Sequence, residues 1–177
     1  AMRLGRGMTY KAAITGLPHG GGKAVIKRPP SLDEKQREQL FTRYGQFIEE
    51  LNGQYITCED SGTRVSDMNL VREQTDHVLG FGEAEGGSGD PSPVTAFGCR
   101  RGIEAAIHHR YGSDEAIDGK TVAIQGVGSV GYYLGRQLHQ RGADLIVTDI
   151  DDEAIERSVN EFGARAVSTD DIYGVDC

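Results

Sequence analysis

The sequence has no tryptophan, few cysteines and no long apolar run. Cys58, Cys99 and Cys177 form an odd, widely spaced set, which fits free thiols in a reducing cytoplasm better than a disulfide framework. There is no Cys-x-x-Cys pair, and the neighbouring His108 and His109 would point in different directions on a helix. We therefore expect no metal site. No hydrophobic stretch approaches the roughly 20 residues that cross a bilayer.

Positive charge is also scarce. The 19 Lys and Arg residues are outnumbered by 27 Asp and Glu residues, which gives a net charge of -8 and excludes the basic face of a nucleic-acid-binding domain. The N-terminal stretch lacks the apolar centre and cleavage site of a signal peptide. We expect a soluble, cytoplasmic globular protein of one large or two small domains, with no nucleic-acid or membrane partner.

The predicted secondary structure is cut off at both ends of the sequence. Ala1 begins inside a helical pattern that continues to Ile14, and the pattern after Asp171 stops at Cys177 without a closing helix. We interpret the sequence as an internal segment of a longer protein.

The first half mixes helical and extended patterns. Residues 2–14 predict a helix, the apolar run Ala24–Ile26 predicts a strand over 23–27, and Tyr55–Thr57 predicts a second short strand. A long helix is expected from about Leu32 to the Asn52-Gly53 turn. Its apolar stripe comprises Leu40, Tyr44, Phe47, Ile48 and Leu51. Another helix follows Gly62, with Ser66 or Asp67 as its N-cap.

The second half alternates strand and helix after a boundary. Residues 80–93 are dense in glycine and contain two prolines, which predicts a linker. A helix to about Tyr111 follows, and then the expected strands are 121–125, 145–148 and 164–167 and the expected helices 129–141 and 151–162. This β-α-β-α-β order predicts a parallel sheet with right-handed crossovers. The predicted fold class is α/β, with a substrate domain of mixed α/β sheet over 1–91 and a Rossmann-like NAD-binding domain over 92–177.

Two groups of residues in the first half can carry chemistry. Gly20, Gly21 and Gly22 lead directly into Lys23, and glycines let a backbone approach a ligand closely. A desolvated lysine at such a place can serve as a general base, although a solvated surface lysine is the alternative. Glu59-Asp60 follows a predicted strand, where a carboxylate can shuttle protons or simply form a turn.

The strongest motif is Gly126-Val127-Gly128-Ser129-Val130-Gly131, which opens a helix directly after a strand. Gly126 allows the tight turn, Gly128 lets a pyrophosphate approach the backbone, and Gly131 lets helix and strand pack closely. Asp149 ends the next strand, where its carboxylate can accept hydrogen bonds from ribose hydroxyls or cap a helix. The sequence therefore predicts dinucleotide binding.

Together these motifs resemble the glutamate/leucine/phenylalanine/valine dehydrogenase superfamily, with leucine dehydrogenases as the most similar members. The resemblance covers almost the whole chain and is carried by Met2-Arg3-Leu4, Met8 to Lys11, Gly20 to Lys23, Tyr55 to Thr57, Glu59-Asp60, Gly62-Thr63, Asp67-Met68, Ser88-Gly89, Pro91 to Ala96, Gln125 to Gly128, Ile146 to Ile150 and Asp171 to Tyr173. It implies NAD-dependent oxidative deamination of an aliphatic L-amino acid by an oligomeric enzyme of amino-acid metabolism.

The resemblance also implies roles for individual residues. Lys23 would be the catalytic lysine, Asp60 the proton-shuttling carboxylate, and Lys11 the ligand of the substrate carboxylate. The remaining substrate-binding positions would be Gly21, Gly22 and Cys58, and the cofactor-binding positions Thr95, Gly126, Val127, Gly128, Ser129, Val130, Gly131, Asp149 and Ile150.

Two positions depart from the family pattern. Cys58 stands where leucine dehydrogenases usually have alanine, and His19 precedes the glycines. These departures leave phenylalanine or valine open as substrates. A non-catalytic NAD-binding regulatory module is a further alternative, which the joint presence of Lys11, Lys23 and Asp60 opposes. The residues after Asp149 are Ile150, Asp151, Asp152 and Glu153, and their charge favours NAD over NADP.

Overall fold

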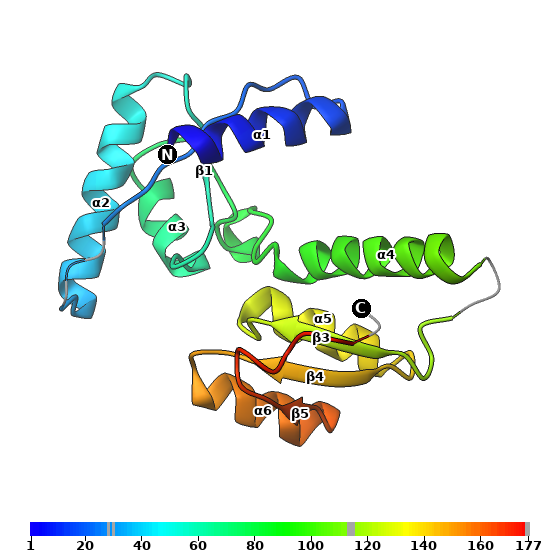
Figure 1. The fold of residues 1–177 in the computed structure, drawn as a ribbon. Coiled ribbons are helices and arrows are strands. Elements are labelled where there is room, and N and C mark those ends of the chain that lie inside the picture. Colours follow the sequence, from blue (N-terminus) through cyan, green and yellow to red (C-terminus); the bar gives the residue numbers. More distant parts are fainter. Residues whose placement is uncertain (28, 30, 113–115, 176–177) are drawn as a thin grey trace. The chain divides into compact units, whose positions relative to one another are not determined.

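The computed structural model describes residues 1–27, 29, 31–112 and 116–175. The chain divides into two compact units, Ala1–Asp90 and Pro91–Cys177 (Figure 1). Each unit has a hydrophobic core of its own. In the part of the chain that is described, no helix is long and apolar enough to span a bilayer.

The first unit combines helices with one small sheet. Strands β1 and β2 pair in parallel, with Thr57 opposite Val78 and Cys58 opposite Leu79. Its elements are α1 (Met2–Thr15), α2 (Glu34–Glu50), β1 (Thr57–Cys58), α3 (Val65–Arg72), β2 (Val78–Leu79) and the short 3₁₀ helix η1 (Glu83–Glu85).

Helix α2 begins at a capping box and packs on α3 through a glycine. Asp33 accepts a hydrogen bond from the Gln36 N–H at 2.7 Å, and Gln36 accepts one from the Asp33 N–H at 3.1 Å. A Cβ on Gly45 would lie 3.1 Å from the Val71 Cα of α3, so the helices touch at this point. The buried face is therefore Phe41, Gly45 and Ile48. Phe47, expected in the apolar stripe, is 54% exposed.

The predicted strand over 23–27 is wrong. Residues 23–27 form no strand, and Val25 is 64% exposed. A strand needs a neighbour for its backbone groups, whereas here the Ala24 N–H donates to the Tyr55 hydroxyl at 3.1 Å. High β-propensity alone does not supply that neighbour.

The predicted N-cap of α3 is also wrong. The cap residue is Arg64, and Asp67 lies at the third helical position. From there the Asp67 carboxylate accepts a hydrogen bond from the Arg64 N–H at 2.7 Å. Asp67 thus stabilises the helix start from inside the first turn, where a carboxylate also complements the helix dipole.

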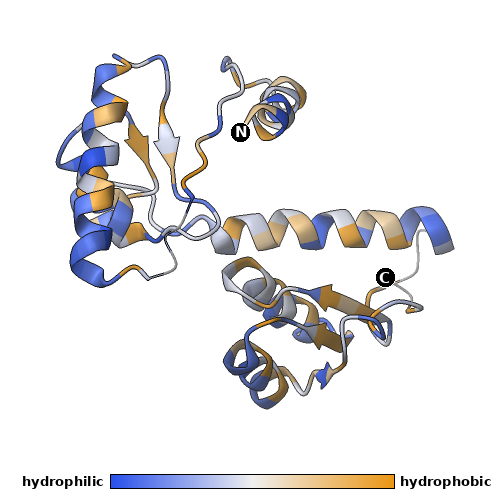
Figure 2. Ribbon diagram, turned by 60° about the vertical axis from the view of Figure 1, so that its left-hand side comes forward, coloured by the Kyte–Doolittle hydropathy of each residue, from blue (hydrophilic) through white to orange (hydrophobic). Residues whose placement is uncertain are grey.

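The second unit confirms the predicted β-α-β-α-β order. The sheet is parallel throughout, in the order β3-β4-β5, and β3 and β4 are formed mainly by hydrophobic residues (Figure 2). The elements are α4 (Ser92–Tyr111), β3 (Thr121–Gln125), α5 (Ser129–His139), β4 (Asp144–Thr148), α6 (Asp152–Phe162) and β5 (Arg165–Ala166). The α/β fold class with a Rossmann-like parallel sheet is confirmed.

The α6 boundaries follow from its caps. Asp151 accepts a hydrogen bond from the Glu153 N–H at 3.1 Å, and Gly163 ends the helix at a left-handed φ of 64°. Between these caps, Ala154 and Phe162 are buried against β3, β4 and α5. The end of β4 and the start of α6 are therefore held at fixed positions, next to the Gly126–Gly131 loop.

Candidate functional site

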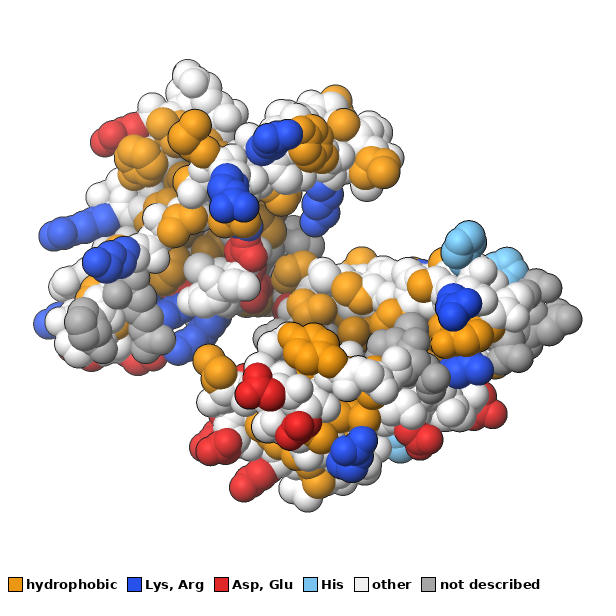
Figure 3. Space-filling model, in the orientation of Figure 1, with side chains coloured by type: hydrophobic (Ala, Val, Ile, Leu, Met, Phe, Trp, Pro, Cys, Tyr) orange, Lys and Arg blue, Asp and Glu red, His pale blue; other side chains and the backbone are white. Residues whose placement is uncertain are grey.

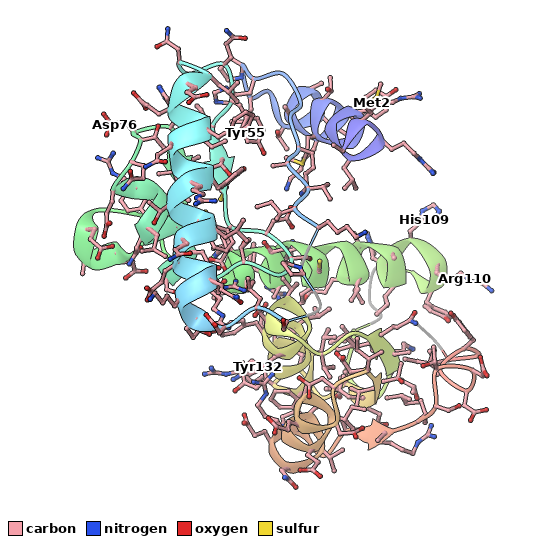
Figure 4. All side chains as sticks on the ribbon, turned by 90° about the vertical axis from the view of Figure 1, so that its left-hand side faces the viewer. Met2, Tyr55, Asp76, His109, Arg110 and Tyr132 are labelled. Atoms are coloured by element: carbon pink, nitrogen blue, oxygen red, sulfur yellow. The ribbon has the colours of Figure 1, made fainter. Side chains whose placement is uncertain are left out.

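The Gly20–Gly22 segment of the first unit is packed rather than free. A Cβ on Gly21 would lie 2.1 Å from the Gly5 carbonyl oxygen and 2.2 Å from the Thr9 nitrogen of α1. A Cβ on Gly22 would lie 2.5 Å from the ring of Tyr55, which is labelled in Figure 4. Both positions therefore require glycine, because backbone and ring occupy the space of any side chain.

This packing brings Lys23 to Asp60. The Lys23 ammonium and the Asp60 carboxylate form an ion pair, and their side chains are 24% and 49% exposed. The two residues come from separate loops of the first unit. The sequence predicted both as site residues, and the structure brings them into contact.

The Asp60 carboxylate is oriented by a turn. The Thr63 N–H donates to the Asp60 carbonyl at 2.9 Å, and Gly62 has a φ of 85°, as the third residue of a type II turn requires. The Ser61 N–H donates to Asp60 Oδ1 at 2.8 Å, which leaves Oδ2 for Lys23. Asp60 therefore forms the turn considered from the sequence and also contacts the lysine, while its proton-shuttling role stays a prediction.

Arg37 and Asp67 form a buried pair that supports this turn. Arg37 Nε donates to Asp67 Oδ1 at 2.7 Å, and the two side chains are 12% and 3% exposed. Arg37 also donates to the Gly62 carbonyl at 2.9 Å. Sequence reasoning missed this support, because nothing local to Arg37 on α2 signals a partner on α3.

Cys58 and Lys11 lie near the Lys23–Asp60 pair. Burial raises the pKa of the Cys58 thiol, and the charges of Lys11 and Lys23 weaken this rise. Lys11 itself is exposed on α1. The gathered groups are two cations, one thiol and one carboxylate, which together can bind a carboxylate substrate and move a proton.

Glu59 carries a buried oxygen without a hydrogen-bond partner among the described residues, Oε2. Burial, followed by the charges of Asp90 and Asp67, raises the pKa of Glu59. The Glu59 carboxyl group therefore binds its proton more tightly in the folded state than in the unfolded state. Stability from this group is fully present below the unfolded pKa and is lost as the pH rises through the folded pKa.

Glu59→Gln is therefore expected to raise the free energy of unfolding at pH 7, by roughly 1 kcal/mol, because it removes a poorly solvated charge. The gain should vanish near pH 4, where the wild-type side chain is protonated. Thermal unfolding at both pH values measures the difference. Glu50→Gln, an exposed change on α2, is the matched control. An equal gain at pH 4 and pH 7 would contradict the assignment.

The Gly126–Gly131 loop of the second unit joins β3 to α5. Gly126 has a φ of 93°, and its N–H donates to the Thr148 carbonyl at 2.8 Å. A Cβ on Gly131 would lie 2.0 Å from the Gly126 carbonyl oxygen, whereas a Cβ on Gly128 would meet no described atom within 4 Å. The turn and the close packing expected for Gly126 and Gly131 are thus observed.

The start of α5 suits a diphosphate. Its N-cap is Gly128, which has no side chain to cap the helix, so the first-turn N–H groups of Ser129 and Val130 are not covered by a cap side chain. A helix N-terminus of this kind attracts anions through these groups and through the helix dipole. The residues present therefore fit the pyrophosphate of a dinucleotide.

Asp149 is bonded mainly to nearby backbone. Its Oδ2 accepts the Val127 N–H at 2.6 Å, and its Oδ1 accepts those of Ile150 and Asp151 at 2.7 and 3.1 Å. A carboxylate has about four acceptor positions, so roughly one stays open for a ribose hydroxyl. The side chain thus has a structural role, and its binding role stays a prediction.

Among the other predicted cofactor residues of this unit, Thr95 and Ile150 lie at the surface and Val127 does not. Thr95 is exposed in the first turn of α4, where its hydroxyl donates to the Pro91 carbonyl at 3.0 Å. Ile150 is fully exposed beside Asp149, and the Val127 side chain is buried in the core. Arg157 of α6 was missed from the sequence, and its guanidinium donates to the Val127 carbonyl at 3.3 Å.

The two glycines of this loop should respond differently to alanine. Gly128→Ala should leave the unfolding temperature unchanged but weaken NADH binding at least tenfold, because the new methyl group fills space where a phosphate would lie. Gly131→Ala should instead destabilise the fold by about 1–3 kcal/mol through overpacking. Thermal unfolding and NADH fluorescence titration on the full-length protein separate the two. Wild-type NADH affinity in the Gly128→Ala variant would show that this loop does not bind the cofactor.

Two protein-family models match the chain, one for each unit. Residues 1–77 match the family described as Glu/Leu/Phe/Val dehydrogenase, dimerisation domain, and residues 86–174 match Glutamate/Leucine/Phenylalanine/Valine dehydrogenase. Leucine dehydrogenase of Bacillus subtilis (strain 168) is 53% identical over 177 residues, which are 100% of this chain and 48% of that protein.

Solved structures share the fold. L-tryptophan dehydrogenase from Nostoc punctiforme matches with a TM-score of 0.65 and 38% identity, over 99% of this chain and 48% of that one. Hetero-hexameric glutamate dehydrogenase from Thermus thermophilus matches with a TM-score of 0.73 and 24% identity, over 98% of this chain and 47% of that one, a likeness of fold alone. The chain spans about half the length of the relatives it matches.

Proposed function

This chain belongs to the glutamate/leucine/phenylalanine/valine dehydrogenase family, and from that premise we propose that the protein oxidatively deaminates an aliphatic L-amino acid of the leucine, valine or isoleucine type. The amino acid, NAD⁺ and water give the 2-oxo acid, ammonium, NADH and a proton, reversibly. The observation that carries the proposal is the Lys23–Asp60 ion pair, held by loops that are themselves fixed by packing.

The pair can act as an acid–base couple. A bound NAD would supply the hydride acceptor, and loss of the hydride from the substrate Cα would leave an imine. Lys23 first gives its proton to Asp60 across the ion pair. As the amine it then takes a proton from water, and the water oxygen attacks the imine carbon. Asp60 Oδ2 faces Lys23 Nζ, so it can receive a proton there and deliver it to the departing nitrogen.

Positioning comes from the surrounding groups. Lys11 binds the substrate carboxylate by charge and so fixes the substrate geometry, while Gly21 and Gly22 let the segment before Lys23 pack against α1 and Tyr55. We assign Cys58, at the end of β1 directly before Glu59-Asp60, to the part of the site that meets the substrate side chain. A thiol there is larger than a methyl group, which favours compact aliphatic side chains over an indole or phenyl ring.

We assign NAD as the cofactor, held by the Gly126–Gly131 loop with Thr95, Asp149 and Ile150. Asp149 and the acids that follow it disfavour a 2′-phosphate by like-charge repulsion. The alternative of a non-catalytic NAD-binding module is disfavoured by the Lys23–Asp60 contact, since a binding module needs no base.

We also propose that the full-length protein is a homo-oligomer. Hydrophobic side chains are exposed over α1 (Figure 3), among them Met2 and Ile14, within the region that matches a dimerisation domain. Such a patch is typical of an interface.

The test is NAD reduction by the full-length protein with each of the twenty L-amino acids at mildly alkaline pH. Leucine, valine or isoleucine should give the highest kcat/KM, and NADP in place of NAD should give much less. Highest activity with phenylalanine or tryptophan would replace the aliphatic assignment. NADH binding without turnover of any amino acid would establish the non-catalytic module instead.

A further inference from the structure

The backbone of Val127 is held from two sides. Its N–H donates to Asp149 Oδ2 at 2.6 Å, and its carbonyl accepts a hydrogen bond from Arg157 Nη2 at 3.3 Å. The Val127 side chain is only 1% exposed and lies in the core of the second unit. The residue between the first two glycines of the loop is therefore fixed by Asp149 after β4, by α6 and by the core.

Arg157 is itself held in place. Its guanidinium lies 4.2 Å from the centroid of the Tyr132 ring on α5, a cation–π contact. The Tyr132 hydroxyl donates to Glu161 of α6 at 2.8 Å; Tyr132 is labelled in Figure 4. A planar guanidinium can stack on a ring and donate a hydrogen bond at once, which an ammonium does less well.

The loop needs such support. Gly126 has a φ of 93°, and a Cβ at Gly128 would meet no described atom within 4 Å, so the glycines leave the backbone little packing of their own. Glycine loses more conformational freedom on ordering than any other residue. A loop that is ordered before the ligand arrives avoids this cost at binding.

We propose that Arg157 is a positioning residue of the dinucleotide site, which fixes the Gly126–Gly128 backbone so that the N–H groups at the start of α5 face the phosphates. The proposal rests on the proposed cofactor role of this loop. Arg157 acts here through Val127 and not by contact with the cofactor. Stacking on the Tyr132 ring orients the Arg157 guanidinium for its hydrogen bond to the Val127 carbonyl.

The experiment compares Arg157→Gln and Arg157→Lys with the wild type in the full-length protein. Arg165→Gln, an exposed change of equal charge on β5, is the control. NADH affinity is measured by fluorescence titration, and amide hydrogen exchange is measured over residues 126–131 without cofactor. Both Arg157 variants should bind NADH about tenfold more weakly and exchange faster in this loop, while Arg165→Gln matches the wild type.

Three results would overturn the proposal. Wild-type NADH affinity in Arg157→Gln would show that the contact is dispensable. Weaker binding with unchanged loop exchange, or full rescue by Arg157→Lys, would show that Arg157 acts by its charge on the phosphates. Failure of the wild type to bind NADH would instead reject the cofactor role itself. Arg157 is exposed on α6, and thermal unfolding of each variant checks that it is folded.

Discussion

Replacing Lys23 by alanine is expected to lower kcat by about a hundred- to ten-thousand-fold, the usual range for loss of a general base. The side chain forms the ion pair with Asp60, so its removal takes away the base and leaves Asp60 without its partner. NADH affinity should be unchanged, because the Gly126–Gly131 loop belongs to the other unit.

The control is Lys27→Ala, an exposed lysine four residues further along the same segment. It removes the same charge and should keep wild-type activity. Steady-state kinetics and NADH titration of both full-length variants make the comparison. If Lys23→Ala kept more than half of the wild-type rate, Lys23 would not be the base.

The second large effect is expected from Gly21→Ala. The new Cβ would lie 2.1 Å from the Gly5 carbonyl oxygen and 2.2 Å from the Thr9 nitrogen, and both are backbone atoms of α1 that cannot rotate away. Either α1 or the segment before Lys23 must move, which separates Lys11 from Lys23. We expect kcat/KM to fall at least a hundredfold and stability to fall by about 1–3 kcal/mol.

Gly20→Ala is the matched control for this change. A Cβ at Gly20 meets no described atom within 4 Å, and Gly20 does not have a positive φ. It should therefore behave as wild type in kinetics and in thermal unfolding. Equal losses in the two variants would mean that the segment tolerates no side chain for reasons other than the packing on α1.

Local patterns predicted the second unit well. The order from Thr121 to Ala166, the glycine turn and the caps Asp151 and Gly163 are each set by residues a few positions apart, so sequence spacing is enough to find them. Arg157 was missed because its partners on the loop and on α5 are distant in sequence.

The first unit was harder to predict because its elements depend on long-range contacts. Ala24–Ile26 has the composition of a strand, yet its backbone meets a tyrosine hydroxyl and no strand. Phe41 is buried in place of Phe47 because Gly45 fixes which face of α2 meets α3. Lys23 and Asp60 were each predicted, but their pairing follows from a fold that spacing does not encode.

The bonds of Asp149 bear on any attempt to redesign this protein for a phosphorylated cofactor. Removing its charge by Asp149→Ser also removes the acceptor that holds the Val127 N–H at 2.6 Å. Such a variant would repel the extra phosphate less. It would also lose the hydrogen bond that positions the Gly126–Gly131 loop, which is proposed to bind the diphosphate. Asp149→Asn discards the charge and retains one acceptor oxygen, which can serve either the Val127 N–H or the N–H groups of Ile150 and Asp151, but not both. A redesign must therefore supply a new acceptor for the N–H groups left over before a cation is added at Ile150.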